Sequence, residues 1–70
     1  MFAQVIVDIV HENVAHTFTY TVPEGMTLQV GQRVEVPFGY RKQEGIVLQL
    51  AQEYDGDYPV EKLKSVSAVL

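Results

Sequence analysis

The chain has 70 residues, 47% of them hydrophobic, and no cysteine, so it forms one small domain that neither disulfides nor thiolate metal sites can stabilise. Nine acidic and five basic residues give a net charge of −4, which argues against a protein that follows a long nucleic-acid backbone. No apolar run approaches the roughly 20 residues that span a bilayer, and no basic segment precedes the first apolar run as in a signal peptide. We therefore expect a cytoplasmic protein without membrane contact.

The first third of the sequence predicts two strands. Apolar side chains fill the odd positions of residues 2–10 and several even ones, which is typical of a strand that is half to mostly buried. Residues 11–17 are polar or small and are expected to form a loop. Residues 18–22 are aromatic or β-branched, and their even-numbered members share one face of a second predicted strand.

The stretch from Val30 to Gly39 predicts the central strand. Valine and phenylalanine alternate there with polar residues or proline, so one face is expected in a core and the other in water. Pro37 cannot donate a ladder hydrogen bond, which predicts that this end of the strand lies at an edge or a bulge. The turn at residues 23–25 and the connection at residues 26–30 lead into it.

The second half predicts a hairpin loop at residues 40–44, a strand at 45–51, a loop at 54–59, one helical turn at 60–64 and a last strand at 65–70. Short strands with closely spaced turns predict a mainly β (small α+β) fold. We expect a compact OB-like or SH3-like β-barrel, or a curled sheet, of about five strands with at most one short helical turn.

The sequence offers little for catalysis or metal binding. His11 and His16 lie five positions apart, whereas the helical zinc-protease motif places its histidines four apart. The acidic turn Asp55-Gly56-Asp57 lacks the further ligands of a calcium loop. No phosphate-binding loop and no nucleophile elbow occurs. We therefore expect no metal, no cofactor and no enzymatic activity in these residues.

Aromatic and basic side chains are the remaining candidates for a binding site. Phe18 and Phe38 are by default core residues, with stacking on a nucleobase as the competing role. Arg41 and Lys42 are by default a solvated hairpin tip, and Lys64 is by default a surface lysine. We expect the end of the central strand, where aromatic, bare backbone and positive charge come together, to take part in any binding.

Five segments follow one another in a recognisable order, and two of them contain the tetrapeptides Val-Pro-Glu-Gly and Val-Pro-Phe-Gly. The segments are Val5–Asp8, Phe18–Gly25, Gly31–Gly39, Gly45–Val47 and Glu61–Lys64. Together they resemble the N-terminal 3′-DNA-end-binding domain of the primosomal protein N′ (PriA) family, and the resemblance covers nearly the whole chain.

The resemblance implies a part of an ATP-dependent 3′-to-5′ helicase that restarts replication at abandoned forks. In that family this domain holds the 3′ end of the nascent leading strand. Phe18 would pack on the terminal base or sugar, Gly39 would let the backbone approach, and Lys64 would meet a phosphate or a base edge. The implied DNA 3′-end pocket consists of Phe18, Thr19, Gly39 and Lys64, with Arg41 and Lys42 as possible additional contacts.

One position departs from the family, which often carries aspartate where this chain has Thr19. Threonine offers one hydroxyl in place of a charged carboxylate, so recognition of the terminal nucleotide is expected to be weaker or differently arranged.

The resemblance also implies a wider context. Residues 1–70 would be a single domain at the N-terminus of a larger helicase, whose ATP, magnesium and zinc sites lie outside this fragment. Expected partners are the 3′ end of single-stranded or forked DNA, other domains of the helicase, and, through the full-length chain, primosome and single-strand-binding proteins. The alternative is a small β-barrel that contacts proteins and does not bind DNA ends.

Overall fold

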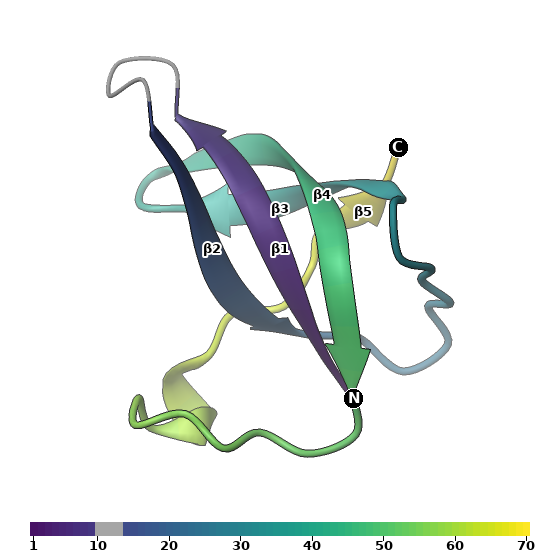
Figure 1. The fold of residues 1–70 in the computed structure, drawn as a ribbon, viewed down its shortest axis with the longest axis vertical. Helices are drawn as coiled ribbons and strands as arrows, with labels where there is room; N and C mark the ends of the chain where they lie inside the picture. Colours follow the sequence, from purple (N-terminus) through teal and green to yellow (C-terminus); the bar gives the residue numbers. More distant parts are fainter. Residues whose placement is uncertain (10–13) are drawn as a thin grey trace.

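The computed structural model describes residues 1–9 and 14–70, which form one curled antiparallel sheet (Figure 1). The strand order is β2-β1-β4-β3-β5, and no helix in the described ranges is long and apolar enough to cross a membrane. The mainly β fold with one short helical turn is therefore confirmed. The elements are β1 (Phe2–Ile9), β2 (Val14–Thr21), β3 (Arg33–Phe38), β4 (Arg41–Ala51), the 3-10 turn η1 (Val60–Lys62) and β5 (Ala68–Val69).

Strand β4 bends the sheet, because its first half pairs with β3 and its second half with β1. Gly45 lies at the bend and is paired with both neighbouring strands. The register shifts by one residue between Gln4 and Val5, which leaves Leu48 as the extra residue of a bulge. Bulges increase the local twist, and this one helps the sheet to curl on itself.

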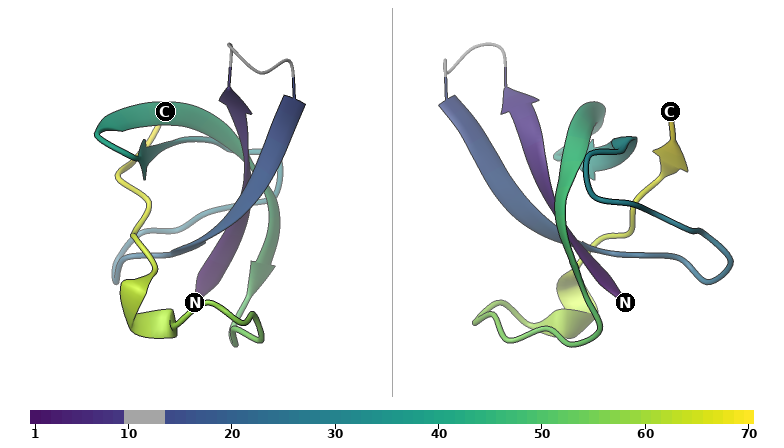
Figure 2. Two further views of the ribbon diagram at one scale, coloured as in Figure 1. Left: turned by 90° about the vertical axis from the view of Figure 1, so that its left-hand side faces the viewer. Right: turned by 45° about the vertical axis from the view of Figure 1, so that its right-hand side comes forward.

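The curled sheet closes where β2 meets the segment between η1 and β5 (Figure 2). The Thr21 N–H donates to the Lys64 carbonyl at 2.9 Å, and the Val66 N–H donates to the Thr21 carbonyl at 3.0 Å. Beside this bridge the Tyr20 hydroxyl donates to the Pro37 carbonyl at 3.0 Å. These contacts join β2 to β3 and to the segment before β5, and turn the sheet into a small barrel.

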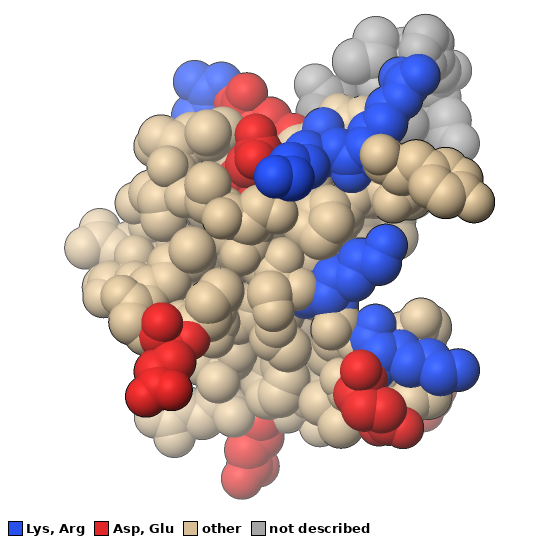
Figure 3. Space-filling view, turned by 180° about the vertical axis from the view of Figure 1, so that it is seen from behind, with Lys and Arg blue, Asp and Glu red and all other residues tan. Residues whose placement is uncertain are grey.

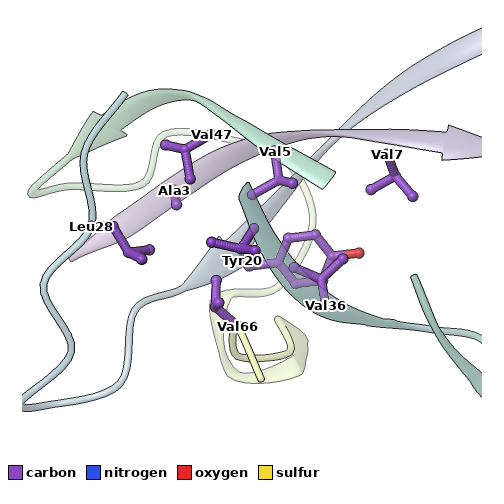
Figure 4. Packing of buried hydrophobic residues seen from close by; sticks show 9 residues of the cluster. Ala3, Val5, Val7, Tyr20, Leu28, Val36, Val47 and Val66 are labelled. Atoms are coloured by element: carbon purple, nitrogen blue, oxygen red, sulfur yellow. The ribbon is translucent and has the colours of Figure 1, made fainter. Parts of the chain in front are cut away.

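The core of the barrel is made mainly of valine (Figure 4). Strand alternation places every second side chain inside, and the polar or larger residues between them face outward. No polar or charged side chain is buried among the described residues. The buried set is Ala3, Val5, Val7, Tyr20, Leu28, Val34, Val36, Val47 and Val66.

Three predicted boundaries were wrong. Strand β2 begins at Val14, so residues 14–17 of the predicted loop pair with β1, and residues 10–13 lie outside the described part. The β3–β4 hairpin turn has only two residues, Gly39 and Tyr40, because β4 begins at Arg41. The expected last strand is reduced to Ala68–Val69, with Ser65 in an isolated bridge.

Pro37 lies at an edge, as expected. Strand β5 pairs with β3 only at Val34 and Glu35, so the ladder ends before the proline is reached. On the opposite side Pro37 stands across from Lys42 in β4.

Gly45→Ala is expected to destabilise the domain by about 1–3 kcal/mol, because overpacking a buried site forces neighbours to move. A Cβ at Gly45 would lie 2.5 Å from Val5 Cγ1 and 2.7 Å from the Ile6 carbonyl oxygen, which is main chain and cannot rotate away. Gly56→Ala is the matched control, because there the close atoms belong to the Tyr54 side chain in a loop. Urea unfolding measures the stability of both variants. Equal losses of unfolding free energy would contradict this expectation.

Tyr20→Phe is expected to cost about 0.5–1.5 kcal/mol at neutral pH through loss of the hydrogen bond to Pro37. Burial raises the pKa of the Tyr20 phenol above its ordinary value of 10.0. A raised folded pKa means that the contribution is complete below about pH 10 and is lost as the pH rises through the folded value. The stability difference between the two proteins should therefore shrink above about pH 10.

The control is Tyr40→Phe, since Tyr40 is fully exposed. Denaturant titrations at neutral and alkaline pH test the linkage. A Tyr20→Phe difference that stays constant into the alkaline range would contradict the raised pKa, and no difference at neutral pH would show that this hydroxyl does not stabilise the closure.

Candidate nucleic-acid interface

A groove of about 420 Å³ runs beside β2, between the β3–β4 hairpin and the segment around η1. It combines aromatic rings, glycine backbone and lysine side chains from four separate stretches of the sequence. Its lining consists of Thr17, Phe18, Thr19, Tyr20, Pro37, Phe38, Gly39, Tyr54, Tyr58, Lys62, Leu63 and Lys64. We refer to it as the end groove.

The fold brings the four residues of the expected pocket into this one groove. Phe18 and Thr19 come from β2, Gly39 from the hairpin turn, and Lys64 from the stretch after η1. The hydrogen bond between the Thr21 N–H and the Lys64 carbonyl fixes that stretch beside β2. The barrel closure therefore assembles the groove.

Phe18 presents a supported but open aromatic surface. Its side chain is 37% exposed, and its ring meets the Phe38 ring edge-on at a centroid distance of 5.2 Å. Phe38 in turn packs against the core. Phe18 is thus neither fully core nor freely solvated, and the ring is held in place while it lines the groove.

Thr19 offers main-chain as well as side-chain groups. The N–H and C=O of Thr21 point away from β1, since they bond to Lys64 and Val66. These directions alternate along an antiparallel strand, so the N–H and C=O of Thr19 point to the same free side. Within the described ranges, β2 has β1 as its only strand neighbour, and the groove borders its other edge.

Gly39 is required by the backbone of the hairpin. Its φ of +60° is a left-handed conformation, and a two-residue turn with glycine first is typical of tight hairpins. A Cβ built at Gly39 would meet no protein atom within 4 Å. The space beside this glycine is therefore open, and a ligand in the groove can approach the main chain closely.

The basic residues differ in whether an acid offsets their charge and in whether they line the groove. Arg33 forms an ion pair with Glu44, and Lys42 lies 3.8 Å from Glu35, so acids of the hairpin offset both charges. Arg41 adjoins the turn, but neither it nor Lys42 lines the groove. Lys62 and Lys64 do line it. Figure 3 shows most of the basic side chains on one side of this face, around an indentation.

Part of the groove lining was not expected from the sequence. Tyr54, Tyr58 and Lys62 line the groove, although residues 54–59 were expected to form only a loop with an acidic turn. Two tyrosines flanking Asp55-Gly56-Asp57 were the available signal, because a loop that is purely solvent-exposed does not need aromatic residues. Tyr58 remains 56% exposed and free to contact a ligand.

The described residues contain no group of three or more histidine, aspartate or glutamate side chains placed to hold a metal ion. His11 lies outside the described residues, and His16 belongs to β2, where its ring lies 6.1 Å from that of Phe18.

The groove can stack a flat ring, form hydrogen bonds to polar edges through main chain and hydroxyl, and attract one or two phosphates.

Comparison with known families agrees with this chemistry. A family model described as the 3′DNA-binding domain (3′BD) of PriA matches residues 4–70. Comparison with individually curated proteins gave no significant match. Since the family match covers nearly the whole sequence, the chain belongs to the PriA 3′-DNA-binding-domain family.

Proposed function

We propose that the end groove is the site at which this domain holds the terminal nucleotide of a DNA strand that ends in a 3′-hydroxyl. The observation that carries the proposal is the convergence of Phe18, Thr19, Gly39 and Lys64, from distant parts of the sequence, on one groove of a domain from this family.

The terminal base stacks on Phe18, and Tyr58 lines the same groove. Every nucleobase has a π-face, so such a contact tolerates all four bases. The free N–H and C=O of Thr19, together with its hydroxyl, hydrogen-bond the 3′-hydroxyl and the sugar. Lys62 and Lys64 attract the adjoining phosphate. Few phosphates are engaged, so binding should depend only weakly on salt.

Membership of the family supports a wider proposal. The domain serves a replication-restart helicase at stalled forks, and the ATP, magnesium and zinc sites lie in other parts of the full-length protein. The other expected partners are further domains of that helicase and, through them, primosome and single-strand-binding proteins in the cytoplasm. Arg41, beside the turn, is placed to add a phosphate contact, whereas the ion pair of Lys42 with Glu35 competes with such a role.

The proposal is tested with oligonucleotides of one sequence that end in either a 3′-hydroxyl or a 3′-phosphate. NMR titration should shift the amides of Phe18, Thr19, Gly39 and Lys64 with the hydroxyl form and much less with the phosphate form. Equal shifts with both forms, centred on Arg33, Arg41 and Lys42, would indicate nonspecific charge contact. No shifts with either form would favour the protein-contact alternative.

Phe18→Leu is expected to weaken binding of a 3′-hydroxyl end by about 1–3 kcal/mol, the worth of one stacked base. Leucine keeps apolar contact with Phe38, so the fold should persist. Tyr40→Leu is the control, because Tyr40 is an exposed aromatic residue that does not line the groove. Fluorescence anisotropy measures both affinities. Equal losses for the two variants would remove Phe18 from the site.

Gly39→Asn tests whether the open space beside Gly39 is needed for binding, while the backbone conformation of the turn is kept. Asparagine tolerates a left-handed backbone, so the variant should fold, while its side chain occupies the groove. We expect binding to weaken by about tenfold, or about 1.4 kcal/mol. Gly25→Asn is the matched control, with a φ of +87° and no protein atom within 4 Å of its Cβ. Unchanged affinity in folded Gly39→Asn would show that the terminal nucleotide lies elsewhere.

A further inference from the structure

A second hollow, of about 280 Å³, adjoins the end groove. Thr19 and Tyr54 line both, so the two cavities meet at these residues. This side hollow lies over the outer face of β1 and β4. Its lining consists of Phe2, Gln4, Thr19, Gln49, Ala51, Glu53, Tyr54, Asp55 and Gly56.

The floor of the side hollow is a row of uncharged polar side chains. Thr19, Gln4 and Gln49 stand directly opposite one another on three neighbouring strands. Residues paired in this way project from the same face of the sheet. Gln4 and Gln49 are exposed, so their carboxamides are available to donate and accept hydrogen bonds.

Aromatic rings bound the same hollow. The rings of Phe2 and Tyr54 lie 5.7 Å apart at an interplanar angle of 37°. Tyr54 is placed between the side hollow and the end groove. A flat ring in the side hollow can therefore contact aromatic rings as well as the carboxamides.

The linings of the two cavities carry opposite charges. Lys62 and Lys64 line the end groove, whereas Glu53 and Asp55 line the side hollow. Acids repel phosphate, so a strand that spans both would keep its phosphates towards the lysines and insert an uncharged group beside the acids. A nucleobase is the part of a DNA strand that satisfies both conditions.

We propose that the side hollow is a second nucleobase subsite, which takes the base next to the 3′-terminal one and favours adenine. The preference follows from the carboxamides, since a glutamine amide bonds adenine at N6 and N7 together. This inference rests on the proposed function of the end groove, because it extends the path of the same strand.

The test compares 5′-labelled oligonucleotides with a 3′-hydroxyl that differ only at the penultimate position, which carries adenine, 7-deaza-adenine, cytosine or an abasic sugar. Anisotropy titration of the unaltered protein should show that the abasic oligonucleotide binds about tenfold more weakly than the adenine one. 7-Deaza-adenine, which lacks only the N7 acceptor, should lose about fivefold.

Gln4→Ala and Gln49→Ala should abolish the difference between adenine and 7-deaza-adenine while leaving the affinity for the abasic oligonucleotide unchanged. Gln52→Ala is the matched control, because Gln52 is exposed and lines neither cavity. It should retain the full adenine preference.

The same series run with a 3′-phosphate distinguishes the two proposals. A clear preference for the 3′-hydroxyl without any effect of the penultimate base would overturn the second subsite and leave the end groove intact. Loss of the 3′-hydroxyl preference itself would overturn both. The oligonucleotide comparison uses the unaltered protein, so its outcome does not depend on whether a glutamine variant folds.

Discussion

The contact that closes the barrel determines where the binding surface lies. The Thr21 N–H donates to the Lys64 carbonyl, and the Val66 N–H donates to the Thr21 carbonyl, both at the edge of β2 that faces away from β1. Two such hydrogen bonds contribute about 0.5–1.5 kcal/mol each, whereas burial of Val66, which is 2% exposed, contributes about 1.5–3 kcal/mol. The two contributions are of similar size, so burial of Val66 and the pair of hydrogen bonds together hold this segment beside β2. Lys64 lies at the free edge of β2 because it belongs to this segment.

The parts of the fold that could be predicted from sequence are those in which side-chain alternation reports burial directly. β1 and β3 alternate because one face of each meets the valine core. The start of β2 carries no such pattern, and residues 14–17 become a strand through pairing with β1. Arg41 to Glu44 resembled a loop because they are mostly exposed polar residues, yet a two-residue turn at Gly39 lets them continue the ladder.

The residues of the candidate site could likewise be predicted only in part. Phe18, Thr19, Gly39 and Lys64 were expected through a family resemblance, and no local pattern related them to one another. The rest of the lining needed the three-dimensional structure, because Tyr58 lies in the 54–59 loop and Lys62 in η1, and the sequence does not show that these segments meet β2. A single sequence reports which side chains are suited to stacking or to phosphate, but it does not report which of them meet.

The charge of the domain also limits what it can hold. Screening at physiological salt confines electrostatic attraction to about 8 Å, so the lysines at the groove act locally despite a net charge of −4. Arg33 and Lys42 are already offset by Glu44 and Glu35. A long strand would have to pass acids on several sides of the barrel. A strand end needs only the few ångströms around Lys62 and Lys64.

Threonine at position 19 fits this arrangement. In the proposed site, an aspartate at this position would place a further negative charge beside the phosphates of a bound strand. With Thr19 the proposed polar contacts come from a neutral hydroxyl and from the main chain at the free edge of β2. Main-chain groups do not depend on the identity of the side chain, but they depend strongly on where the strand edge lies. In this protein the Thr21 bridge fixes that edge only two residues away. Recognition therefore relies more on the barrel closure and less on a single charged side chain.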